Sequence, residues 1–197
     1  YEWTEDCELR LTLTAESDAP TVLNLTNHAY FNLNGEGNGN ILGHTLRMNC
    51  SEYLPTDETQ IPLGESAPVA GTPMDFVNEK PVGQDIRADF EPLKIGAGYD
   101  HCWVIDGADG TLKEFATVTE ETSGRVMKVF TDLPGVQFYA GNCISDTVGK
   151  DGVLYTKRTG LCLETQYYPD TANKPQFPSA VFGPDRKYET VTVYQFV

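Results

Sequence analysis

One histidine of this chain stands in an unusually polar setting. Residues 23–33 begin as an apolar alternation and end in hydrogen-bonding side chains around His28, including three Asn, a Thr and a Tyr. A strand that only packs against a core does not usually carry so many polar groups. We therefore expect this stretch to end a strand and to form a wall that binds a polar molecule. His28 is its best candidate for proton transfer, because imidazole titrates near neutral pH.

A carboxylate in a second run, residues 161–166, is the other candidate for chemistry. The two leucines of this run share one face, so Glu164 shares the other face with Cys162 and Gln166. From spacing alone, a solvated outer face is the simplest interpretation. Two features weaken it: the neighbours on that face are uncharged, and the run leads directly into the aromatic and proline-rich residues 167–170.

Two further polar side chains suit a binding cleft. Asp100 precedes His101 at the entrance to a predicted strand, where it is either a turn residue or a ligand for hydroxyl groups. Gln137 shares strand parity with Tyr139, an arrangement that fits a polar cleft and an ordinary outer face equally well. A His and a Glu that converge on such a cleft could transfer protons on both sides of one substrate.

Other chemistries find less support. The three histidines lack metal-ligand spacing and no cysteine pair accompanies them, so we expect no metal site. No Gly-x-Ser-x-Gly elbow presents a serine nucleophile. The glycines of residues 34–40 precede a predicted strand and not a helix, which indicates a turn and not a phosphate cradle. His44 alternates with apolar residues and is expected to be structural, whereas His101 could be structural or functional.

Composition limits the possible partners and the compartment. The chain has 197 residues and a formal net charge of −15, which opposes binding to nucleic acid and to anionic lipid. No apolar run reaches the length of a membrane span. The five cysteines are odd in number and widely spaced, as is typical of free thiols in a reducing compartment such as the cytoplasm. Because the chain starts with Tyr1 in a strand-like run, we expect a further N-terminal part to precede it.

Short β-type runs bounded by Gly, Pro, Asp or Asn dominate the chain. They cover residues 8–14, 22–26, 42–50, 102–106, 115–119, 125–131, 136–140, 161–166 and 190–197. One short helix is expected over 85–90, and the proline-rich residues 51–83 are expected to form a long connection against the core. This pattern predicts an all-β antiparallel sandwich or barrel, with residues 1–197 as a single domain.

Several segments, in order, resemble the aldose 1-epimerase (galactose mutarotase) family. They are residues 24–33 (NLTNHAYFNL), 53–62 (YLPTDETQIP), 99–101 (YDH), 134–142 (PGVQFYAGN), 162–170 (CLETQYYPD) and 173–178 (NKPQFP). The resemblance covers essentially the whole chain. It implies a large antiparallel β-sandwich of the galactose mutarotase-like type, incomplete at its N-terminus.

The resemblance also implies a function and the roles of individual residues. The family interconverts the α and β anomers of a hexose such as galactose or glucose, with neither metal nor organic cofactor. By resemblance, His28 would be the general acid on the ring oxygen and Glu164 the general base on the C1 hydroxyl. The residues that would contact the sugar are Ala29 (through its backbone), Tyr30, Asp100 and Gln137.

The chain departs from the family pattern in two places. An asparagine-arginine pair and a further histidine of the family fall before Tyr1, so we expect activity to need that N-terminal part, in the same or a separate chain. The family's Pro-Gly-Glu turn reads PDRK at residues 184–187. This change lies in a predicted surface turn.

Three alternatives remain open at this point. The first is a non-catalytic carbohydrate-binding β-sandwich, although binding alone needs neither an acid nor a base. The second is a glycoside hydrolase that uses Asp100 and Glu164 as a carboxylate pair. The third is a mutarotase for phosphorylated hexoses, which would need a basic phosphate pocket that this chain does not offer.

Overall fold

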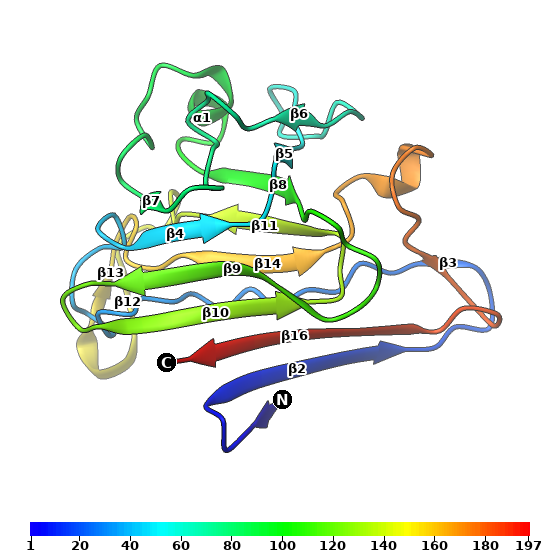
Figure 1. The fold of residues 1–197 in the computed structure, drawn as a ribbon, viewed down its shortest axis with the longest axis horizontal. Helices are drawn as coiled ribbons and strands as arrows, with labels where there is room; N and C mark the ends of the chain where they lie inside the picture. The colour runs from blue at the N-terminus through cyan, green and yellow to red at the C-terminus, as the bar shows by residue number, and fades with distance from the viewer.

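The computed structural model describes all 197 residues, and its regular secondary structure consists mainly of antiparallel strands (Figure 1). A seven-stranded sheet has the order β1-β2-β16-β10-β9-β4-β7, and a five-stranded sheet has the order β14-β11-β8-β5-β6. Two small two-stranded sheets, β12-β13 and β15-β3, complete the fold. The predicted all-β antiparallel class is confirmed. The few helices are short, and none is long and apolar enough to cross a membrane.

The large sheet is built mainly from the strands with the clearest alternation. Its strands are β1 (Glu2–Trp3), β2 (Glu8–Ala15), β16 (Tyr188–Phe196), β10 (Arg125–Thr131), β9 (Lys113–Glu120), β4 (Thr45–Met48) and β7 (Lys80–Pro81). The smaller sheet contains β14 (Cys162–Gln166), β11 (Gly135–Tyr139), β8 (Asp100–Val104), β5 (Glu52–Tyr53) and β6 (Ala67–Pro68). The remaining strands are β3 (Thr21–Val22), β12 (Thr147–Val148), β13 (Leu154–Tyr155) and β15 (Val181–Phe182).

Two predicted elements are misplaced. The strand predicted over residues 22–26 ends at Val22, because polar side chains of the following segment bind backbone groups elsewhere in the fold. The helix predicted over 85–90 is absent, and α1 instead spans Glu91–Ile95. Pro92 lies in its first turn, where the missing N–H of proline costs no hydrogen bond.

The main core lies between the two sheets. Buried residues such as Val118, Met127 and Val129 come from the seven-stranded sheet, and Trp103, Phe138 and Leu163 come from the five-stranded one. All five cysteines are free, as predicted. His44 is structural, as expected: it is buried, and its Nε2 accepts the N–H of Leu33 at 2.9 Å.

The long connection of residues 51–83 lies against this core, as predicted. Met74 and Phe76 are fully buried, and Phe76 packs edge-on against Tyr99 and Phe138 with ring centroids 5.0 and 5.6 Å apart. Burial of these rings gives the connection a fixed position, although its strands β5, β6 and β7 are only two residues long each.

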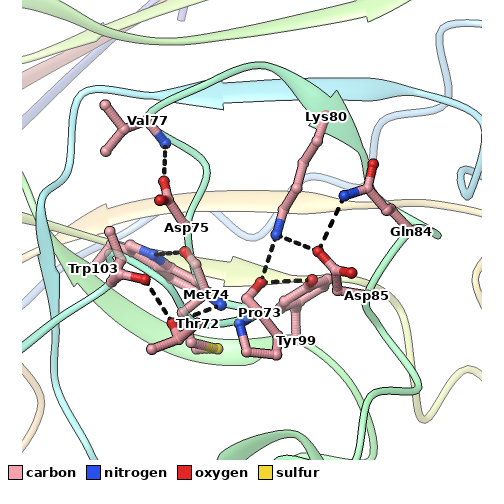
Figure 2. A network of polar contacts seen from close by, with 11 residues as sticks. Thr72, Pro73, Met74, Asp75, Val77, Lys80, Gln84, Asp85, Tyr99 and Trp103 are labelled. Atoms are coloured by element: carbon pink, nitrogen blue, oxygen red, sulfur yellow. Dashed lines mark hydrogen bonds and ion pairs between the residues drawn. The ribbon is translucent and has the colours of Figure 1, made fainter.

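A network of polar contacts also holds this connection to the start of β8 (Figure 2). The Trp103 indole donates to the Met74 carbonyl at 3.1 Å, and the Tyr99 hydroxyl donates to the Pro73 carbonyl at 3.0 Å. The Lys80 ammonium donates to the same Pro73 carbonyl at 2.7 Å. Because Tyr99 and Trp103 flank the first residues of β8, the network fixes the position of that part of the strand.

We predict that Phe138→Ala lowers the free energy of unfolding by about 3–5 kcal/mol, because it removes a fully buried ring from the aromatic core. Chemical denaturation measures the change. Val148→Ala, at a position that is 70% exposed, is the control and should change stability by less than about 0.5 kcal/mol. Equal effects of the two substitutions would contradict the assignment of Phe138 to the core.

Candidate active site

The outer face of the five-stranded sheet carries the polar side chains. Alternation along β11 places Val136 and Phe138 in the core and turns Gln137 and Tyr139 to the opposite face. Across β8, β11 and β14 the register aligns that face in two rows: Asp100, Tyr139 and Cys162 in one, and Cys102, Gln137 and Glu164 in the next. The sheet itself therefore brings together carboxylates that are far apart in sequence.

Apart from the buried Cys162, the residues of these rows line a cleft of about 470 Å³. Every predicted site residue except Ala29 lines it, namely His28, Tyr30, Asp100, Gln137 and Glu164. The Ala29 side chain is not part of the lining. No lysine or arginine is among the lining residues, so the cleft offers no basic phosphate pocket.

His28 is held in place by a segment that is not a strand. At one end, the Asn24 amide exchanges two hydrogen bonds with the Tyr167 backbone, of 2.9 and 2.8 Å. At the other end, the backbones of Phe31 and Leu161 exchange two bonds of 2.8 and 2.9 Å. The two anchors lie just beyond the two ends of β14, so residues 24–31 run antiparallel along this edge strand.

This arrangement brings His28 next to Glu164. The His28 Nε2 lies 3.7 Å from the Glu164 Oε1. The His28 ring stacks on the Tyr30 ring with centroids 4.9 Å apart, and the Tyr139 ring meets it edge-on at 6.1 Å. The two partners differ in exposure: the His28 side chain is 51% exposed and that of Glu164 only 11%.

The environment of Glu164 changes its acidity. Burial raises the pKa of the Glu164 carboxyl above its ordinary value, and the negative charge of Asp100 adds to this rise. The nearby His28 opposes the rise and lowers the pKa. The net direction is upward, which makes Glu164 a stronger base than an exposed glutamate.

Asp100 is held by an amide. The Gln137 Nε2 donates to the Asp100 Oδ1 at 2.8 Å. Burial raises the pKa of Asp100, and the contacts with Gln137, Gln60 and His28 each lower it, so the net direction is upward. Because the Gln137 amide nitrogen points to Asp100, its oxygen remains available to another donor.

Buried polar atoms without a hydrogen-bond partner occur only in the wall of this cleft. They are Thr56 Oγ1, His101 Nε2 and Gln137 Oε1. An unpaired buried polar atom costs about 1–3 kcal/mol. The concentration of such atoms in one wall is typical of a site that binds a polar ligand.

His101 takes one defined protonation state. Burial lowers the pKa of His101 to about 4, so its ring is neutral at neutral pH. Its Nδ1 accepts the backbone N–H of Asp100 at 3.2 Å, so the proton of the ring lies on Nε2. The sequence alone had left its role open.

Sequence reasoning did not single out Thr56 and Gln60 as cleft residues. Both lie in a compact loop in which Asp57 accepts hydrogen bonds from Thr59 and from the backbone N–H of Ile61. Gln60 has a positive φ of 66°, which this local bonding supports. The only sequence signal for the loop was its place in the family-like segment 53–62.

The fold also assembles a possible set of metal donors. The Nε2 or Nδ1 of His28, the Sγ of Cys162 and a carboxylate oxygen of Glu164 all lie within 4.8 Å of one another. Sequence spacing could not indicate this group, because His28 comes from a different part of the chain and reaches β14 only through the anchors described above.

We predict that Gln137→Leu raises the pKa of Asp100 further, because the substitution removes a hydrogen bond that favours the ionised carboxylate. A pH titration of the Asp100 carboxyl carbon by NMR measures the shift. Gln166→Leu is the matched control, since Gln166 lines the same cleft and does not lower the pKa of Asp100. An unchanged or lowered pKa in Gln137→Leu would show that the Gln137–Asp100 bond does not form in solution.

Comparison with known sequences shows which family this chain resembles. The family model described as aldose 1-epimerase matches residues 1–195. A galactose mutarotase of Pongo abelii is 42% identical over 191 residues, which cover 96% of this chain and 54% of that protein. An aldose 1-epimerase of Escherichia coli K12 is 35% identical over 199 residues, which cover 100% of this chain and 57% of that protein. The chain thus spans about half the length of the curated relatives that it matches.

Solved structures agree with the sequence comparison. An aldose epimerase homologue from C. elegans superimposes with a TM-score of 0.85 at 27% identity, covering 98% of this chain and 57% of that one. A galactose 1-epimerase from Lactobacillus acidophilus superimposes with a TM-score of 0.83 at 29% identity, covering 100% of this chain and 55% of that one. The fold is therefore the antiparallel β-sandwich of these proteins, and the chain belongs to the aldose 1-epimerase family.

Proposed function

We propose that the protein of which this chain forms at least a part catalyses the interconversion of the α and β anomers of a hexose such as galactose or glucose. The observation that carries the proposal is the pair formed by His28 and Glu164, 3.7 Å apart in an open polar cleft of an aldose 1-epimerase fold. The ring oxygen and the C1 hydroxyl are attached to the same carbon. An acid and a base that serve both oxygens must therefore lie within a few ångströms of each other.

The proposed reaction needs one proton delivered and one removed. His28 gives a proton to the ring oxygen while Glu164 takes the proton of the C1 hydroxyl, and the bond between C1 and the ring oxygen breaks. The resulting open-chain aldehyde rotates about its C1–C2 bond. Closure on the opposite face returns both protons and gives the other anomer. The raised pKa of Glu164 suits this role, because a base works best with a pKa near the working pH.

The cleft wall suits a ligand with many hydroxyl groups. In this proposal Asp100 accepts from a sugar hydroxyl, and Gln137 accepts from another through its unpaired Oε1. Tyr30, half exposed and stacked on His28, borders the sugar together with the Ala29 backbone. Because the unpaired atoms of Thr56, His101 and Gln137 are buried, pairing them with a ligand requires side-chain rotation in this proposal.

Two further parts of the proposal concern the rest of the molecule and its location. We propose that residues outside this chain complete the sandwich and contribute to sugar binding, since the relatives are about twice as long. The free cysteines support a reducing compartment such as the cytoplasm. The proposed step uses only side chains and needs no metal or organic cofactor.

We predict that His28→Gln and Glu164→Gln each reduce the catalysed rate by about 10²- to 10⁴-fold, because each removes one proton-transfer group. Polarimetry on the full-length protein with freshly dissolved α-D-galactose and α-D-glucose measures the rate above the buffer blank. Glu189→Gln, an exposed position on β16, is the matched control and should keep the wild-type rate.

A sugar-binding assay and an assay with a glycoside substrate, beside the polarimetry, separate the alternatives. If the intact protein binds sugar and does not accelerate mutarotation, the carbohydrate-binding interpretation replaces the enzyme. If the intact protein releases reducing sugar from a glycoside, the glycoside hydrolase interpretation replaces the mutarotase.

A further inference from the structure

The proposed mechanism uses none of the thiols in or beside the cleft, among them that of Cys162. Cys162 is fully buried and shares the outer face of β14 with Glu164, two residues along the strand. Its sulfur, the His28 imidazole and the Glu164 carboxylate form the cluster whose donor atoms lie within 4.8 Å of one another. The thiol therefore lies next to both proposed proton-transfer groups.

The chemistry of this cluster matches one class of cation. Thiolate sulfur, imidazole nitrogen and carboxylate oxygen are the ligands of zinc, whereas magnesium and calcium prefer oxygen alone. Bond lengths of about 2.0–2.3 Å and tetrahedral angles place two zinc ligands about 3.5 Å apart. His28 and Glu164, at 3.7 Å, already lie close to that separation. The half-exposed His28 side chain has room to adjust, while Cys162 and Glu164 are fixed on one strand.

The charges around the cluster favour a cation. Asp100 and Glu164 both line the cleft, and no lysine or arginine does. His101, the other titratable nitrogen in the lining, is buried and neutral at neutral pH. A dication that enters between His28 and Glu164 therefore meets carboxylates and no fixed positive charge. Three protein ligands leave a fourth position open toward the cleft, as in zinc sites that bind water or substrate.

We propose that His28, Cys162 and Glu164 form a binding site for a thiophilic divalent cation of the zinc and cadmium class, and that the bound cation inhibits the enzyme. The sulfur–metal bond forms as the Cys162 thiol loses its proton to solvent, with no change in oxidation state. The metal then occupies the lone pairs that His28 and Glu164 need for proton transfer. Binding is independent of the proposed function, and only the inhibition depends on it.

The test is a cadmium titration of the full-length protein, with the double variant Cys7→Ala/Cys143→Ala as the starting point. This variant removes the two exposed thiols, of which Cys143 also lines the cleft. We expect it to show the ultraviolet sulfur-to-cadmium charge-transfer band with one cadmium bound per chain. We also expect the cadmium to inhibit mutarotation and saturating galactose to weaken its binding.

Adding Cys162→Ala, or Cys162→Ser as a second variant of similar size, should abolish the band and weaken inhibition at least about tenfold. Inhibition is expressed relative to the uninhibited rate of each variant. The site is overturned if the band persists without Cys162 or is lost in the Cys7→Ala/Cys143→Ala variant. If the enzyme is active and cadmium gives the charge-transfer band without inhibiting it, the site stands and only the inhibitory role is overturned. If the protein has no mutarotase activity, the proposed function fails and the band still tests the site.

Discussion

The attachment of an irregular segment to an edge strand is the constraint on which the site depends. β14 is the last strand of the five-stranded sheet, and residues 24–31 run beside it without a regular ladder. Paired hydrogen bonds at Asn24 and at Phe31 hold the two ends of this segment. The closeness of His28 to Glu164 and to Cys162 follows from these anchors. Without these hydrogen bonds, less interaction energy would offset the conformational entropy that the segment loses when it is ordered.

Along the strands of the smaller sheet, residues that pack in the core alternate with residues that face the cleft. On β11, Phe138 packs in the aromatic core while its neighbour Gln137 holds Asp100. On β14, Leu163 is in the core while Glu164 faces the cleft. Because adjacent residues point to opposite faces, the packing of one fixes the direction of the other. Precise placement of the cleft groups is thus a consequence of a well-packed core.

Sequence patterns predicted the regular parts of this protein better than the irregular ones. Short β-type runs between turn residues predicted β2, β10 and β16, because both the runs and their boundaries are local features of the sequence. The strand prediction failed for residues 23–26, where side-chain hydrogen bonds such as those of Asn24 replace the backbone hydrogen bonds of a sheet. His28 and Glu164 stood out by their residue types and by family resemblance. Thr56 did not, because its place in the cleft arises from loop closure, which no local pattern encodes. Alternation placed Cys162 on the face of Glu164, but only the anchored segment brings His28 close to it.

The unpaired atoms in the cleft wall couple ligand binding to folding. Thr56, His101 and Gln137 each carry a polar atom without a partner, and Glu164 and Asp100 are both partly desolvated. A ligand that supplies partners for these atoms therefore releases free energy on binding. Linkage between binding and folding converts that release into resistance to unfolding, by about 2.7 kcal/mol at a ligand concentration of 100 times Kd. A molecule that pairs these atoms would therefore also prolong the lifetime of the folded protein.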